Sequence, residues 1–189
     1  MTLTELVKEY DGKVRVVYKN MVVHPQTVQK AHQATCAAAK QQKFLPYYHA
    51  FWEKGFNAYA QSRDPSKLGE ENILAIVKEL GMDPARFKTD MDSPECVGFV
   101  QADMQELGKF KVNATPAFFV NGKFVGGALP KEGFKQIIDQ QLKIAEASGV
   151  SGADYYAKEI MGKGEKAFKS SSPAAGGGGG GGGHDGHGH

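Results

Sequence analysis

The chain has 189 residues, 41% of them hydrophobic, which is enough for one domain with a buried core and attached segments. Its formal net charge is +2 and acidic residues are interspersed with basic ones, so the composition favours neither a nucleic-acid partner nor an anionic membrane. No apolar run approaches the ~20 residues that span a bilayer. The first residues also lack the basic start and apolar centre of a signal peptide.

The beginning of the chain predicts a helix and then a strand. Leu3, Leu6 and Tyr10 recur at the spacing of one helical face, so residues 2–10 should form an amphipathic helix. Residues 14–18 follow with the β-branched composition that is typical of a strand.

Residues 25–108 predict a block of helices, several of which have a proline in the first turn. Aromatic side chains gather around the second predicted helix. Because their spacing is helical and no basic stripe accompanies them, we expect them to pack in the core rather than stack on nucleic-acid bases. These residues are Phe44, Tyr47, Tyr48, Phe51, Trp52 and Phe56.

A β-hairpin is predicted around Asn121-Gly122. Both residues tolerate the positive φ of a type I′ turn, and a short apolar, strand-forming run lies on either side. Side chains alternate along a strand, so Phe118 and Val120 should face one side of the sheet and Phe119 the other.

The run T-P-A-F-F-V-N-G-K-F-V-G-G at residues 115–127, followed by a predicted helix, resembles the thioredoxin fold. The resemblance is closest to the DsbA-like branch, whose helical insertion is similar to the block at residues 25–108. It implies that the Thr115–Pro116 bond is cis, although most proline bonds in folded proteins are trans. It also implies that Thr115 and Pro116 show their backbone to an extended substrate. We therefore expect an α/β, thioredoxin-like fold with an inserted helical subdomain (DsbA-like), N-terminally incomplete.

The resemblance divides the chain into three parts. Residues 1–147 should form the DsbA-like domain, residues 148–169 a helical extension, and residues 170–189 a disordered Gly/His-rich tail. Glycine at the density of this tail cannot repay the entropy lost on ordering. Its terminal histidines could bind Ni²⁺ or Zn²⁺ weakly, but nothing preorganises them, so we expect no dedicated metal site.

The chemistry of the DsbA-like family needs a Cys-x-x-Cys at a helix start, where one thiolate attacks and the other cysteine resolves the mixed disulfide. This chain contains no such motif, so we assign no catalytic residue. The motif and the central core strand are expected ahead of Thr2, which predicts a shortened chain whose residues 14–18 and hairpin flank an absent strand. An empty slot, direct pairing of the flanking strands, or a strand from another chain would each agree with that expectation.

The two cysteines, sixty positions apart, leave several roles open. Cys36 lies mid-helix among small residues, which is typical of a buried, inert thiol. Cys96 lies in a helical first turn that could activate it, but no resolving cysteine is near in sequence. A catalytic role for either one and a disulfide between them both remain open. His24, just before a helix, is a cap, part of an active-site rim, or a packed loop histidine.

The resemblance implies a thiol–disulfide oxidoreductase acting on protein cysteines, with this chain alone inactive because it lacks the dithiol. One alternative is a non-enzymatic thioredoxin-fold domain that binds extended peptides at Thr115 and Pro116, and another is a glutathione-binding relative. We expect no cofactor. The implied partners are thiol- or disulfide-containing proteins and an unidentified redox partner, and the implied location is periplasmic or otherwise extracytoplasmic in a bacterium.

Overall fold

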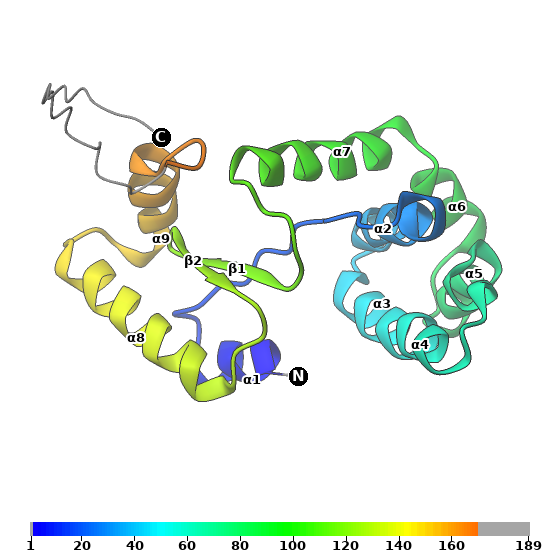
Figure 1. Ribbon diagram of the computed structural model, residues 1–189, viewed down its shortest axis with the longest axis horizontal. Helices are drawn as coiled ribbons and strands as arrows, with labels where there is room; N and C mark the ends of the chain where they lie inside the picture. Colours follow the sequence, from blue (N-terminus) through cyan, green and yellow to red (C-terminus); the bar gives the residue numbers. More distant parts are fainter. Residues whose placement is uncertain (1, 170–189) are drawn as a thin grey trace, which may run out of the picture.

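A computed structural model describes residues 2–169, which form two parts (Figure 1). A block of helices built from residues 25–109 lies on one side, and a smaller part with the first helix, a β-hairpin and the last long helix lies on the other. The predicted tail, with its histidines, lies outside the described residues. None of the described helices is both long and apolar enough to cross a membrane.

The block consists of helices, as its sequence predicts. Asp83 and Ser93 each cap a helix by accepting backbone hydrogen bonds, and each is followed by a proline, whose missing N–H costs nothing at that position. The elements are α2 (Pro25–Lys40), α3 (Phe44–Phe51), a π-helix (Trp52–Asn57), α4 (Ala58–Ser62), a 3₁₀ turn (Pro65–Leu68), α5 (Glu70–Glu79), α6 (Pro84–Met91) and α7 (Pro94–Lys109).

The core of the block forms where α2 meets α3, α5 and α6. Its α2 face is made of small side chains, which let the neighbouring helices approach closely and bring larger apolar residues against it. The buried members are Ala31, Ala34, Ala37, Ala38, Tyr47, Ile73, Ile76, Val77, Met82, Phe87 and Met91.

The smaller part is held by two helices, α1 (Thr2–Glu9) and α8 (Lys131–Ala147). Leu6 of α1 is buried with Phe134 and Ile138 of α8. Around this contact, Lys131 and Lys135 form ion pairs with Glu9, which reinforce the same helix pair at the surface.

The hairpin is confirmed, with β1 (Ala117–Val120) antiparallel to β2 (Lys123–Gly126). The turn residues have φ values of 47° at Asn121 and 88° at Gly122, as a type I′ turn requires. Phe118 and Val120 pack on the Leu6 cluster, whereas the Phe119 ring contacts Phe110 and Phe124, so the predicted faces are also confirmed.

The strand predicted at residues 14–18 is wrong. This segment has no regular secondary structure, and the only sheet among the described residues has two strands, β1 and β2. Val14 and Tyr18 are half-buried by side-chain contacts, while Val17 is 57% exposed. A strand needs a neighbouring ladder, and no described strand lies beside this segment, so its β-branched composition has nothing to pair with. The structure is therefore mostly helical with a small sheet, and neither direct pairing of this segment nor a larger sheet is formed.

The chain after α8 contacts the segment that follows α1 and the end of α7. It contains α9 (Gly152–Tyr155) and a π-helix (Tyr156–Met161). The guanidinium of Arg15 lies 4.4 Å from the centre of the Tyr156 ring. Further on, the Phe168 N–H donates to the Lys109 carbonyl at 2.9 Å, which ties residue 168 to the end of α7.

Candidate functional site

The two residues predicted to face a substrate, Thr115 and Pro116, lie just before β1. The Thr115–Pro116 peptide bond is cis, as the resemblance implies. The Gly127 N–H donates to the Pro116 carbonyl at 2.9 Å, so Pro116 is joined to the hairpin by one bond beyond the end of the strand. Thr115 and Pro116 are both exposed.

The outer edge of β1 is open. The two-residue turn closes on Val120 paired with Lys123, so Val120 and Phe118 direct their backbone groups toward β2. The alternate residues, Ala117 and Phe119, direct theirs away from β2, and no other described residue hydrogen-bonds to them. An unpaired row of N–H and C=O groups therefore starts directly after Pro116.

An apolar cavity of about 180 Å³ is lined by Phe118 of β1 and by Tyr18, among others. Burial raises the pKa of the Tyr18 hydroxyl above its ordinary value, and burial together with Tyr18 does the same for Tyr48. Both phenols therefore stay protonated at neutral pH, where they remain able to donate hydrogen bonds. The lining residues are Thr2, Leu3, Thr4, Tyr18, Tyr48, Phe118, Ala128, Leu129 and Phe134.

A ladder of aromatic rings leads from the cavity along α3 and the π-helix. Tyr48 stacks on Trp52 at 6.3 Å between ring centres, and Trp52 stacks on Phe56 at 4.7 Å. Trp52 and Phe56 are 42% and 41% exposed. The expectation that all six of these aromatics pack in the core is thus wrong, because Tyr47 alone among the six is fully buried.

Two rows of aromatic residues lie on different faces of this helical segment, and they are offset by one position in the sequence. Tyr47 and Phe51, four residues apart, pack into the block, whereas Tyr48 and Trp52, each one position later, form the outer ladder. The sequence contained the signal, since two rows at four-residue spacing cannot share one face of a helix. We name the outer row, Phe44, Tyr48, Trp52 and Phe56, the aromatic ladder.

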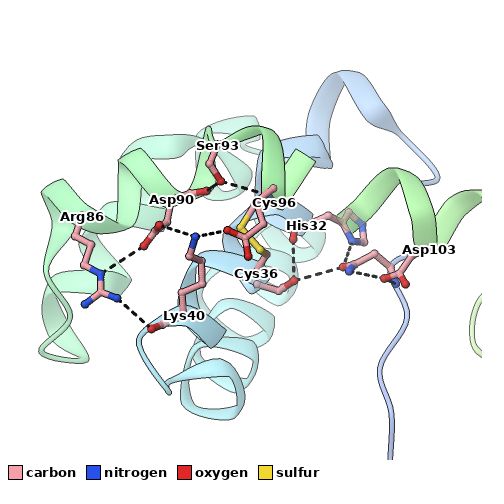
Figure 2. The surroundings of a disulfide bond; sticks show 11 residues. His32, Cys36, Lys40, Arg86, Asp90, Ser93, Cys96 and Asp103 are labelled. Atoms are coloured by element: carbon pink, nitrogen blue, oxygen red, sulfur yellow. Dashed lines mark hydrogen bonds and ion pairs between the residues drawn. A yellow bond between two sulfur atoms is a disulfide. The ribbon is translucent and has the colours of Figure 1, made fainter. Parts of the chain in front are cut away.

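A second candidate site is a disulfide between Cys36 of α2 and Cys96 of α7 (Figure 2). The two Cα atoms are 5.5 Å apart, within the usual range for a disulfide. The expectation of an inert thiol at Cys36 is therefore wrong: the residue is helical but only half-buried, and its sulfur is bonded. Cys96 is fully buried, and its N–H donates to the Ser93 hydroxyl at 3.3 Å.

Charged groups lie on one side of the disulfide (Figure 2). The ammonium of Lys40, one helical turn after Cys36, lies 3.0 Å from an Asp90 carboxylate oxygen and 2.6 Å from Glu95. Hydrogen bonds to Glu95 and Asp90 hold the pKa of the Lys40 ammonium above its ordinary value. Arg86 adds a second cation, 3.6 Å from Asp90.

A buried polar network lies on the other side. Asp103, which is 2% exposed, accepts hydrogen bonds at 2.9 Å from both the backbone and the side-chain nitrogen of Asn20. The Asn20 side-chain oxygen lies 3.0 Å from His32 Nδ1 and also accepts from the Thr35 hydroxyl. Burial lowers the pKa of the His32 imidazole, an effect that the Asp103 charge partly offsets. A neutral His32 with its proton on Nδ1 completes the network, which attaches the segment before α2 to α7.

The structure does not bring His24 into either site. His24 occupies the N-cap position of α2, but its side chain forms no capping hydrogen bond; it is exposed, so it is not the packed histidine that the sequence allowed. Within residues 2–169 no group of histidine, cysteine and acidic side chains is arranged to hold a metal ion.

Comparisons with known proteins point to one family. The thioredoxin family matches residues 1–140 of this chain. The chain is also 28% identical over 124 residues to the Na⁺/H⁺ antiporter NhaA of Herminiimonas arsenicoxydans, a match that covers 66% of this chain but only 18% of the antiporter. No solved structure matches significantly. The family match covers well over half of the chain, which therefore belongs to the thioredoxin family.

Proposed function

We propose that this chain takes part in protein thiol–disulfide chemistry by holding extended, cysteine-containing segments of other proteins along the open edge of β1. The observation that carries the proposal is the backbone of Ala117 and Phe119, which pairs with no described residue and continues from the exposed Thr115 and Pro116. We thus assign substrate binding to Thr115 and Pro116, and Ala117 and Phe119 continue the binding edge.

The geometry suits an extended peptide because an added strand forms main-chain hydrogen bonds that are independent of its sequence. Selectivity then comes from where its side chains fit. The cavity beside Phe118 is apolar, so it favours a substrate with an aliphatic or aromatic side chain, and the Tyr18 and Tyr48 hydroxyls supply donors at its wall.

The redox part of the proposal rests on the family and on the disulfide. Disulfides form and persist in oxidising compartments, so the bond between Cys36 and Cys96 supports an extracytoplasmic, periplasm-like location. The chain has no Cys-x-x-Cys, so we assign to it the binding of a protein substrate in the manner of the DsbA-like branch, and not catalysis through that motif.

The decisive experiment removes one hydrogen-bond donor from each edge of the hairpin. Phe119 and Phe124 are paired in register, both rings are exposed, and both N–H groups point away from the partner strand. Phe119→Pro should weaken binding of a fluorescent, unfolded cysteine-containing peptide by about tenfold, since one lost hydrogen bond is worth about 0.5–1.5 kcal/mol and the new ring also blocks the approach. Fluorescence anisotropy measures the affinity.

Two controls accompany this variant. Phe124→Pro makes the same change on the opposite edge and should leave the affinity within about twofold. Phe119→Ala removes the ring but keeps the N–H, and so separates edge pairing from ring contact. Equal affinity of the Phe119→Pro variant and the parent chain would refute the proposal. Displacement of the peptide by millimolar glutathione would favour the glutathione-binding alternative.

A further inference from the structure

The two cysteines of the disulfide differ in access. Cys96 is 0% exposed, whereas Cys36 is half-buried on α2. Exchange begins when a thiolate attacks one sulfur and displaces the other, so access decides which sulfur is attacked. Only Cys36 offers an approach from solvent, with Cys96 behind it as the group displaced.

The surroundings of Cys96 suit a leaving thiolate. Cys96 is the third residue of α7, where the helix dipole and unpaired N–H groups stabilise negative charge. Figure 2 shows the Lys40 side chain reaching from α2 to this helix start, with Arg86 farther out. Asp90 and Glu95 offset these two cations.

On the other side of the disulfide lie His32 and Asp103, and neither presents a free charge to Cys36. One helical turn earlier, His32 is kept neutral by burial, and the Asp103 carboxylate is engaged by Asn20 and Lys19. The charged groups that act on the exchange reaction are therefore those beside Cys96.

We infer that the Cys36–Cys96 disulfide is an exchangeable redox pair that accepts two electrons from an external dithiol, with Cys36 as the attacked sulfur. One thiolate of the dithiol bonds to the Cys36 sulfur while the bond between Cys36 and Cys96 breaks and Cys96 leaves as a thiolate. The second thiolate then attacks the external sulfur of the mixed disulfide and releases Cys36. The dithiol is oxidised to a disulfide, and the two protein thiolates take up the two protons that it loses.

The disulfide is one of several links that hold the Cys36 helix in the block. Four alanines of the Cys36 helix pack into the apolar core, and His32 of the same helix is joined through Asn20 to Asp103 of α7. Reduction therefore leaves α2 and α7 in contact, and the pair can cycle within a folded protein.

This inference goes beyond the proposed function and does not depend on it. The disulfide lies in the helical block, whereas the peptide edge lies on the hairpin (Figure 1). Peptide binding can fail while exchange is observed, and exchange can fail while peptide binding is intact.

The test uses the full oxidised chain and reduced glutathione as the attacking thiol, followed by acid quenching, alkylation of free thiols and peptide mass spectrometry. Glutathione should be found on Cys36 about ten times as often as on Cys96, because attack depends on access. Reduction with excess dithiothreitol should go to completion in native buffer, and the reduced chain should still melt cooperatively. Equal labelling of the two cysteines, reduction only in denaturant, or loss of the cooperative melt would overturn the inference.

Charge variants test the leaving group directly. Lys40→Gln removes a cation beside Cys96 and should slow formation of the mixed disulfide several-fold, while Glu95→Gln removes an anion and should accelerate it several-fold. Lys30→Gln makes the same charge change on the same helix at the Asp92 pair, and its rate should match the parent. Equal rates for all three variants would show that Cys96 does not leave as a stabilised thiolate.

Discussion

The helical block and the hairpin part use their apolar and polar groups differently. The block has eleven buried residues in one core, a disulfide, and helices that satisfy most of their own backbone groups. The hairpin part has a core cluster of only three buried residues, a cavity, and a sheet whose outer edges are unpaired among the described residues. From this comparison we expect the block to supply most of the stability, whereas the hairpin part carries the groups to which we assign the binding of a partner.

The largest expected effect is a core truncation in the block. Phe87 is fully buried and its ring centre lies 5.7 Å from that of Tyr47, so Phe87→Ala should lower the free energy of unfolding by about 3–5 kcal/mol. Phe134 in the hairpin part borders the existing cavity, so the loss of free energy of unfolding caused by Phe134→Ala should lie at the low end of that range. Trp52 fluorescence during urea unfolding reports on the block, and hydrogen exchange of β1 reports on the hairpin.

These two variants also test whether the parts are separate. We expect Phe87→Ala to shift the fluorescence transition and Phe134→Ala to shift mainly the hairpin exchange. If each variant shifts both signals equally, the two parts unfold as one unit and the distinction between them applies only to binding.

The next largest loss of stability is expected when the disulfide is removed. The double substitution of Cys36 and Cys96 by alanine should cost about 2–4 kcal/mol, since the bond closes a loop of sixty residues and limits the unfolded chain. The hairpin exchange rates should change little. The urea transition of this variant measures the loss, and a chain that fails to fold at all would show that the core of the block is not sufficient.

A smaller effect is expected at the polar network. Asp103→Ala leaves the Asn20 donors unpaired and should cost about 1–3 kcal/mol. Glu106→Ala removes an exposed partner of the same Lys19 and should cost less than about 1 kcal/mol. Equal costs, measured by urea unfolding, would mean that the network does not hold the segment before α2 against α7.

The pH dependence should follow His32. Its folded pKa lies below the ordinary value of 6.5, so the unfolded chain binds more protons once the pH falls through that value. The stability from neutral His32 is therefore complete above pH 6.5 and declines as the pH falls below it. His32→Gln should flatten this decline in a series of urea titrations, and an unchanged slope would assign it to other groups.

The sequence was informative where structure depends on near neighbours. Asn121-Gly122 predicts the hairpin, and caps such as Ser93 predict helix starts, because the relevant contacts lie within a few residues. Which face of a helix meets the core depends on distant helices, and composition alone did not separate the Tyr47 row from the aromatic ladder. The pairing of Cys36 with Cys96 likewise depends on how α2 packs on α7.

The smallest expected effect tests the segment whose strand prediction is wrong. The Val17 N–H hydrogen-bonds to no described residue and the side chain is exposed, so Val17→Pro removes nothing that the fold uses and should change the free energy of unfolding by less than about 0.5 kcal/mol. Lys123→Pro is the matched control, because Lys123 is also exposed but is hydrogen-bonded to Val120 across the hairpin, and it should cost about 1–3 kcal/mol. Urea unfolding measures both. A loss at Val17 as large as at Lys123 would mean that residues 14–18 pair with another strand in solution, and the open edge of β1 would then be the first place to look for that strand.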